Sequence, residues 1–173
     1  MREKEPIKTS DIAVLEKTLI NLINTFPELP VQIEKDGVFF QNLKPKNISM
    51  GLATIPNNSI IDETWLCGSY FAQYWFRILL QKMSVTNDER IGAQDILGKV
   101  SHWLEKTPIE KENGTVYRLE EYPPLEGNRK IEAIEIVSFP RLVDRIPPNI
   151  EIHEVKLKLT YFVKKSLFCV NRL

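Results

Sequence analysis

The residues most able to do chemistry in this chain are two histidines and two cysteines, and they lie far apart in the sequence. Zinc sites need three or four ligands, usually in short pairs such as CxxC or HxxxH. The four residues Cys67, His102, His153 and Cys169 form no such pair. His102 precedes Trp103 on a predicted helix, and His153 is in phase with the inward residues of a predicted strand. We therefore interpret both histidines as structural and expect no metal centre.

The sequence motifs for phosphate binding and acid–base catalysis give no stronger signal. The seven glycines are scattered and form neither a GxGxxG loop nor a GxxxxGKS or GxxxxGKT loop. The acidic pairs Glu120-Glu121 and Glu132/Glu135 have the pattern of solvated faces, although paired carboxylates can serve as general acid and base. A Cys–His or Ser–His nucleophile stays open, because such groups meet in space rather than in sequence. We expect a protein that is not an enzyme and that uses no cofactor.

Composition and charge narrow the classes of partner. The chain of 173 residues fits one domain, with polar residues 1–9 expected to be flexible. Its 23 Lys and Arg balance 23 Asp and Glu, which disfavours specific nucleic-acid binding and suits self-association. Two cysteines make no disulfide framework, and the N-terminus lacks the apolar core of a signal peptide. No stretch approaches the ~20 apolar residues of a membrane span, so we expect a reduced, cytoplasmic protein without a membrane partner.

Two segments have the apolar periodicity of amphipathic helices. The first runs from Ile12 to Phe26, with Ser10 as its N-cap and Asp11 in the first turn. The second begins at the cap Thr86-Asn87 and stops before Pro108. Its predicted apolar face consists of Ile91, Ile96, Leu97, Val100, Trp103 and Leu104. Glycines 92 and 98 weaken this helix and could mark close approach to a sheet.

The remaining apolar segments are predicted to be strands. They are 31–34 and 38–40, paired as a hairpin through Lys35-Asp36-Gly37, then 48–55, 60–66, 70–81, 115–122, 131–139 and 151–163. Strands 60–66 and 70–81 should form a hairpin through Cys67-Gly68-Ser69, and 140–149, with three prolines, is expected to be an ordered loop. In the last strand Val155, Leu157, Leu159, Tyr161 and Val163 should face inward, with Glu154, Lys156, Lys158 and Thr160 outward. This order predicts an α+β fold, a mostly antiparallel sheet with two main amphipathic helices packed on it.

The strand from Tyr70 to Gln81 is apolar on both of its faces. One face carries Tyr70, Ala72, Tyr74, Phe76, Ile78 and Leu80, and the other carries Phe71, Gln73, Trp75, Arg77, Leu79 and Gln81. A strand with one solvated face should alternate cleanly between apolar and polar residues. Two explanations stay open: a loop covers the second face, or that face meets a neighbouring subunit, since aromatics and Arg are enriched in interfaces. The candidate subunit interface consists of Phe71, Trp75, Arg77 and Leu79.

The middle of the chain resembles a known family. The segments that carry the resemblance are GSYFAQ at 68–73, the strand 74–80, the polar break 84–88, RIGAQDIL at 90–97 and WLEK at 103–106. In this order they are similar to the minor capsid or tail-terminator proteins of long-tailed bacteriophages, especially those of Gram-positive hosts. The resemblance covers about residues 10–165 and is most specific from 52 to 106. Segment 106–148 is longer and more proline-rich than the family pattern, which leaves the partner-binding loops unassigned.

The resemblance implies an assembly function without enzymatic activity. Proteins of that family form a ring, generally a hexamer, on the last ring of the tail tube, where they stop tube growth and dock the head connector. The expected partners are therefore further copies of this chain, the tail tube protein and the head connector or head-completion protein. The expected location is the head–tail junction of the virion, after assembly in the host cytoplasm. The Pro-rich segments 107–130 and 140–149 are candidates for contacts along the ring axis, and the alternative that each is an inert connection stays open.

Three other functions stay open on the residues alone. The nearest is another head–tail joining or tail-completion protein with the same symmetry. A small-ligand-binding or enzymatic α+β domain would use a pocket lined by Tyr70, Tyr74 and Arg77. A nucleic-acid module would use arginines and aromatic residues, against the balanced charge of the chain.

Overall fold

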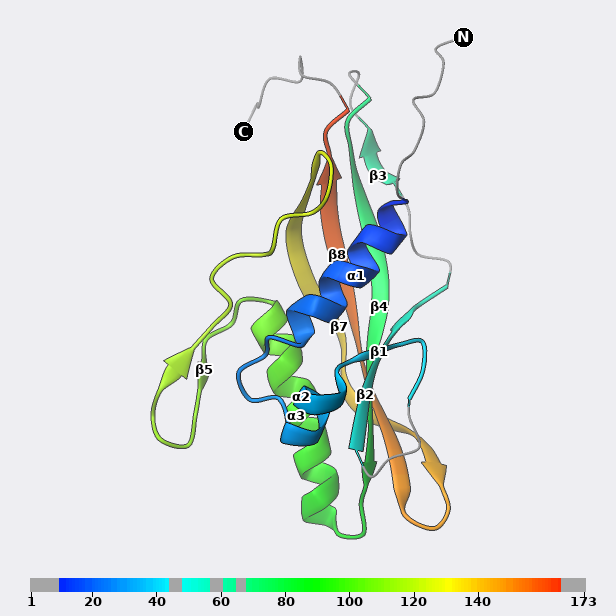
Figure 1. Ribbon diagram of the computed structural model, residues 1–173, viewed down its shortest axis with the longest axis vertical. Coiled ribbons are helices and arrows are strands. Elements are labelled where there is room, and N and C mark those ends of the chain that lie inside the picture. Colours follow the sequence, from blue (N-terminus) through cyan, green and yellow to red (C-terminus); the bar gives the residue numbers. More distant parts are fainter. Residues whose placement is uncertain (1–9, 44–47, 57–60, 65–67, 166–173) are drawn as a thin grey trace.

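The computed structural model describes residues 10–43, 48–56, 61–64 and 68–165 of the chain (Figure 1). For residues 61–64 it describes the backbone alone. Its helices are α1 (Asp11–Ile23), α2 (Val31–Asp36) and α3 (Asn87–Leu104). Its strands are β1 (Phe39–Phe40), β2 (Ile48–Thr54), β3 (Ile61–Thr64), β4 (Tyr70–Met83), β5 (Ile109–Glu110), β6 (Val116–Tyr117), β7 (Arg129–Ile146) and β8 (Ile150–Val163).

The main sheet has the strand order β1-β2-β4-β8-β7, and β3 also pairs with β4. All of its pairings are antiparallel except that of β1 with β2. The three helices lie together on one face of this sheet (Figure 1). The predicted α+β fold, a mostly antiparallel sheet with helices packed on it, is confirmed.

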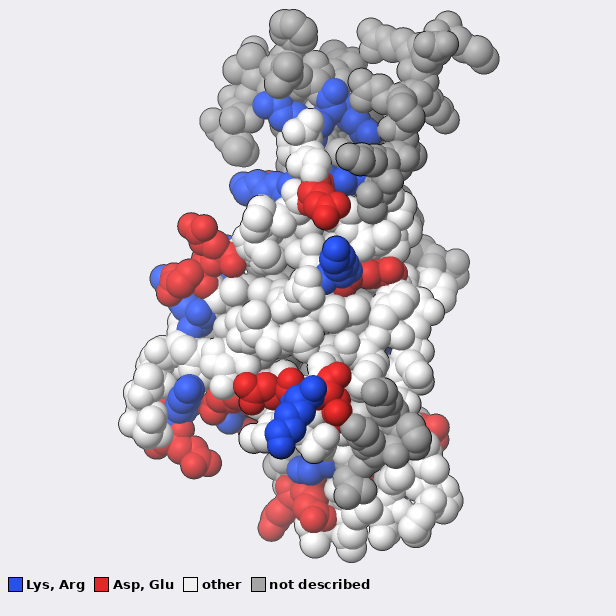
Figure 2. All heavy atoms as spheres, viewed as in Figure 1, with Lys and Arg blue, Asp and Glu red and all other residues white. Residues whose placement is uncertain are grey.

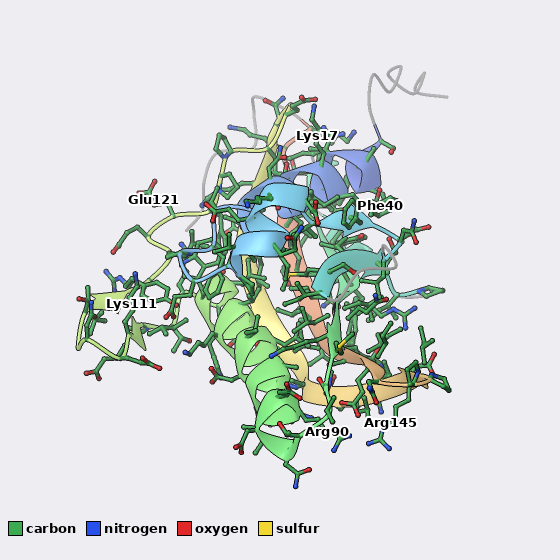
Figure 3. The ribbon with its side chains drawn as sticks, turned by 60° about the horizontal axis from the view of Figure 1, so that its bottom comes forward. Lys17, Phe40, Arg90, Lys111, Glu121 and Arg145 are labelled. Atoms are coloured by element: carbon green, nitrogen blue, oxygen red, sulfur yellow. The ribbon has the colours of Figure 1, made fainter. Side chains whose placement is uncertain are left out.

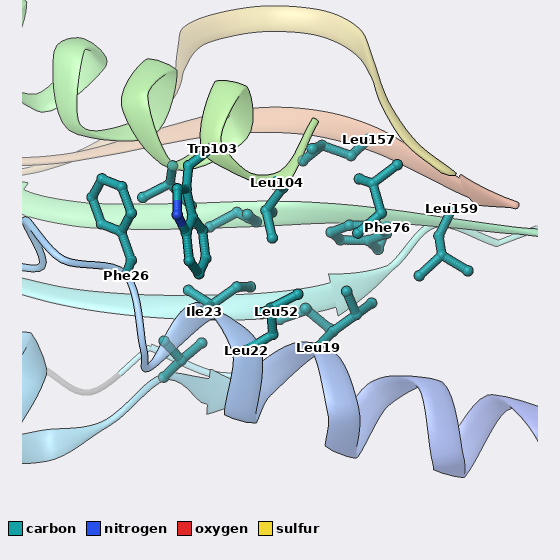
Figure 4. Close-up of a cluster of buried hydrophobic side chains, with 14 of the residues drawn as sticks. Leu19, Leu22, Ile23, Phe26, Leu52, Phe76, Trp103, Leu104, Leu157 and Leu159 are labelled. Carbon is teal, nitrogen blue, oxygen red and sulfur yellow. The ribbon is translucent and has the colours of Figure 1, made fainter. Parts of the chain in front are cut away.

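The core lies between the helices and the inward face of β4 and β8. Every second residue is buried from Ala72 to Leu80 in β4 and from Glu151 to Val163 in β8, as the alternation predicts. Figure 4 shows Leu19, Leu22 and Ile23 of α1 facing side chains of the sheet. The same close-up shows Phe26 against Trp103 of α3, with ring centroids 5.5 Å apart in an edge-on arrangement. One continuous core therefore joins both main helices to the sheet.

Both main helices begin at their predicted caps. The Ser10 hydroxyl accepts a hydrogen bond from the Ala13 amide, 3.3 Å away. At α3 the Thr86 side chain accepts from the Glu89 amide, and the Glu89 carboxylate accepts from the Thr86 amide, which completes a capping box. The hydrogen bonds from the Thr86 and Val85 amides hold the pKa of Glu89 below its usual value. These caps position the helices through local contacts alone.

The predicted hairpin of 31–34 and 38–40 is wrong. Residues Val31–Asp36 form helix α2, and β1 pairs in parallel with β2 instead. Ile33 is buried against the core, and the Asn24 side chain accepts a hydrogen bond from the Val38 amide at 3.0 Å. Gly37, with φ +77°, ends the helix. A Lys-Asp-Gly sequence serves equally as a hairpin turn and as the end of a helix, and tertiary packing decides between them.

The predicted loop 140–149 is also wrong over most of its length. Strand β7 continues through Pro140 to Ile146 and forms a long hairpin with β8. Proline lacks the amide hydrogen that a central strand needs, but β7 is an edge strand with register shifts on both sides of Pro140. The segment is therefore an arm of the sheet.

Several smaller predictions need correction. The strand expected at 115–122 shrinks to Val116–Tyr117, which pairs with β5 in a separate two-stranded sheet. Ile91 is 65% exposed, and Ala93 takes its place on the buried face of α3. A Cβ atom at Gly92 or Gly98 would meet only ordinary contacts, at 3.7 and 4.0 Å. The close approach occurs at Gly51, where a Cβ atom would lie 2.5 Å from the Asn42 carbonyl oxygen.

Candidate interface on the open face of the sheet

The side chains on the helix-free side of β4 and β8 form what we call the open face. They are Phe71, Gln73, Trp75, Arg77 and Leu79 of β4 with Glu154, Lys156, Lys158, Thr160 and Phe162 of β8. Of the helices that the structure describes, none lies on this side (Figure 1). Most of these side chains are half-buried, because their strand neighbours cover their flanks while their tips stay accessible. The open face is therefore an accessible surface with an apolar component.

All four residues of the predicted interface lie on this open face. Phe71 pairs across the strands with Phe162, with ring centroids 4.9 Å apart. The Trp75 indole nitrogen donates to the Gln73 side-chain oxygen at 3.1 Å, so its polar atom is satisfied within the strand. Leu79 is half-buried, and the Arg77 side chain is 44% exposed. The four residues therefore share one face of β4, as predicted. Their contact with another subunit stays a prediction.

The charged half of the open face is built on a carboxylate that we predicted to face solvent. Glu154 is only 2% exposed. Arg141 donates to one of its oxygens at 2.7 and 3.1 Å, and Arg77 donates to the other at 3.3 Å. The Lys156 amine lies 3.7 Å from the same carboxylate. Glu154 lies on the predicted face of β8, but the prediction that it is exposed to solvent is wrong. Three cations from three strands cover its side chain.

Two opposing effects act on the pKa of Glu154, namely burial and the neighbouring cations. Burial alone would raise the pKa of the carboxyl, since it disfavours the charged form. The hydrogen bonds from Arg141 and Arg77 and the charge of Lys156 outweigh burial, so the pKa lies below its ordinary value. Glu154 is thus ionised at neutral pH and fixes Arg77 and Arg141 on the surface. The sequence analysis did not identify Arg141 and Glu154 as an ion pair. Their pairing depends on the register of a bulged hairpin, for which the local sequence gives no signal.

A second buried carboxylate joins the hairpin to helix α3. Glu151, 3% exposed in its side chain, accepts from the Arg90 guanidinium at 2.7 Å and from Arg145 at 3.1 Å. Figure 3 shows Arg90 at α3 and Arg145 on the hairpin at the same end of the molecule. A pocket of about 270 Å³ lies beside them, with Ser84 and Pro148 also in its wall. The two arginines and Glu151 tie the hairpin to α3.

The two histidines occupy different environments. His153 is 1% exposed on the inward side of β8, as its phase predicted, with one ring nitrogen 3.6 Å from a Glu151 oxygen. Burial lowers the pKa of the His153 imidazole, which favours its neutral form. His102 lies on the exposed side of α3, its side chain 47% exposed and 3.6 Å from Glu105.

Tyr70, Tyr74 and Arg77, which the ligand-binding hypothesis places around one pocket, do not lie together in the structure. Tyr70 and Tyr74 point to the helix side of β4, where their hydroxyls meet Asp11 at 2.5 Å and Thr54 at 2.9 Å. Burial is the main cause that raises the pKa of both tyrosines to about 12. Arg77 lies on the opposite face of the same strand. These three side chains cannot line one pocket.

The remaining candidates for chemistry are dispersed. Glu120 and Glu121 are exposed, and Glu132 and Glu135 are 35% and 55% exposed in their side chains. Among the described residues, no group of three or more His, Cys, Asp or Glu side chains is placed to hold a metal ion. Cys67 and Cys169 lie outside the described residues.

None of the helices within those described ranges is long and apolar enough to cross a membrane. No protein-family model matches the chain, and no curated protein matches it.

Proposed function

We propose that this protein is a structural assembly protein, a tail terminator that caps the tail tube of a long-tailed phage as a homo-oligomeric ring. In this role it docks the head connector at the head–tail junction of the virion. The ring is a hexamer, as in the family that the sequence resembles. The proposal includes no catalytic step.

The observation that carries the proposal is the line of Phe71, Trp75 and Leu79 on the open face of β4. Large apolar side chains that stay accessible on a sheet face are typical of interaction surfaces, especially when Arg stands among them. Arg77 stands in this line and is held in place by Glu154. A rigid, preorganised surface loses little conformational entropy on association. This face is suited to contact with another folded chain.

The shape of the molecule supports contacts along a ring axis. The β7–β8 hairpin ends in the turn Pro147-Pro148-Asn149, and the β5–β6 hairpin extends from the body on the other side of α3 (Figure 1). Loops and hairpin ends on a rigid scaffold commonly carry binding residues. In the proposal these two hairpins contact the tail tube protein and the head connector.

Self-association of the purified chain tests the proposal. Native mass spectrometry at rising concentration, alone and with isolated tail tubes, should show oligomers, and electron microscopy should show them at tube ends. Trp75→Ala should weaken association about 30-fold or more, the effect of losing ~2 kcal/mol at an interface hot spot.

Val85→Ala is the matched control for this experiment. Val85 is an exposed apolar residue, 59% exposed, in the turn between β4 and α3 and outside the open face, so its truncation should leave self-association unchanged. A wild-type chain that stays monomeric at every concentration, and also in the presence of tail tubes, would overturn the proposed function.

A further inference from the structure

Charge is divided unequally between the two layers of the molecule. The helix layer, defined as residues 10–40 and 87–128, has fourteen Asp and Glu against seven Lys and Arg, a net charge of −7. The strand layer, residues 48–56, 61–64, 68–86 and 129–165, has ten Lys and Arg against seven Asp and Glu, a net charge of +3. The balanced charge of the whole chain therefore conceals two layers of opposite sign.

Acidic side chains of the helix layer are accessible. Figure 2 looks onto this layer and shows acidic groups gathered over its lower half. Asp95 is 58% exposed, and Glu34 is exposed on α2. The hydrogen bond to Asp95 raises the pKa of Lys99, and the charges of Glu28 and Glu112 raise it further. One lysine thus faces three carboxylates, which leaves a surplus of negative charge.

The open face carries the opposite surplus. Its most buried carboxylate, Glu154, lies beneath three cations, of which Arg141 is 59% exposed and Arg77 is 44% exposed. Lys130, whose register partner Phe162 belongs to the open face, is 72% exposed. Lys158 is paired with the exposed Glu135 at 2.8 Å. The three cations that contact Glu154 carry more positive charge than its single carboxylate neutralises.

We infer that, in the ring proposed above, the open face of one copy packs against the acidic helix layer of the next copy. The two surfaces lie on opposite sides of the same molecule, so this contact is head-to-tail. A head-to-tail contact is heterologous, and such contacts form a ring when the rotation from one copy to the next closes. Contact of two open faces would instead bring two positive surfaces together, and like charges across an interface cost several kcal/mol. A second copy of the chain supplies both the apolar contact and the complementary charge.

Charge reversal on each surface separately, followed by mixing, tests the inference. The open-face variant is Lys130→Glu with Lys158→Glu, and the helix-layer variant is Glu34→Lys with Asp95→Lys. These positions leave Arg77, Arg141 and the buried carboxylates intact. Each variant alone should associate at least about tenfold more weakly than wild type, because at every contact the two reversed groups then meet charges of their own sign. An equimolar mixture should regain wild-type oligomers with equal numbers of the two variants, since alternating copies restore complementarity at every contact.

The control is Lys111→Glu with Arg118→Glu, which changes the net charge as the open-face variant does but adds negative charge to the helix layer. It should associate as tightly as wild type or more tightly. Circular dichroism and thermal unfolding should show that every variant is folded.

The outcomes separate this inference from the proposed function. If wild type forms rings and the helix-layer variant does so equally well, the inference is wrong while the ring function stands. A mixture that fails to recover also contradicts it. If wild type binds a DNA oligonucleotide through Lys130 and Lys158 without self-association, both the inference and the proposed function are wrong.

Discussion

Glu154 shows how one side chain can organise a surface. Its carboxylate is buried under Arg141, Arg77 and Lys156, and those cations then face outward. A buried ion is tolerated only when its partners satisfy it, so removing one member of such a cluster is costly. Arg77 consequently has a structural role in addition to its predicted role in an interface.

Replacing this carboxylate should destabilise the fold. We expect Glu154→Gln to lower the free energy of unfolding by about 2–4 kcal/mol, because three cations lose their counter-charge. Urea unfolding measures this difference. Glu135→Gln, which breaks an exposed ion pair with Lys158, should cost about 1 kcal/mol or less. Equal effects of the two substitutions would show that Glu154 is not structurally special.

At the scale of elements, the chain just after β1 passes close to strand β2 at Gly51. The Asn42 carbonyl oxygen stands where a side chain at Gly51 would begin. This oxygen belongs to the backbone, which cannot rotate away as a flexible side chain does. Gly98 is the opposite case, since its nearest neighbour is the Pro140 ring at an ordinary distance of 4.0 Å.

These two glycines make a matched pair for substitution. Gly51→Ala should lower the free energy of unfolding by about 1–3 kcal/mol through overpacking. Gly98→Ala should raise it by about 0.5–1 kcal/mol, because alanine is the better helix former. Thermal and urea unfolding check both values, and a neutral Gly51→Ala would mean that the crossing chain yields easily.

At the scale of the whole molecule, stability should depend on pH through the end where α3 meets the hairpin. His153 is surrounded there by Glu151, Lys82 and Arg145. Its pKa is lowered in the folded protein, so below the ordinary value of about 6.5 the unfolded chain takes up a proton more readily. The pKa values of Glu151 and Glu154 are also lowered, so their contributions are present above the ordinary value and are lost as pH falls through the folded pKa.

We therefore expect the melting temperature to fall as the pH is lowered from 7 to 5.5, and to fall further in the acid range. Differential scanning calorimetry against pH measures it. His153→Gln should remove the first part of this decline, whereas His102→Gln should retain it because His102 is largely exposed. A melting temperature that rises between pH 7 and 5.5 would contradict the assignment of His153.

Local pattern was enough to predict much of this protein. Caps and periodicity predicted α1 and α3, and alternation predicted the buried faces of β4 and β8 and the single face shared by Phe71, Trp75 and Arg77. The same alternation already places Tyr70 and Tyr74 opposite Arg77, so the pocket of the ligand-binding hypothesis could have been rejected from the sequence.

The tertiary structure decided what depends on distant neighbours. Residues Val31–Asp36 fold as a helix because Ile33 packs on the core, and β7 continues through Pro140 because it lies at the sheet edge. Glu154 is buried because Arg77 and Arg141 come from separate strands to cover it. Sequence periodicity reports which side of an element is apolar, but it does not report which element lies opposite.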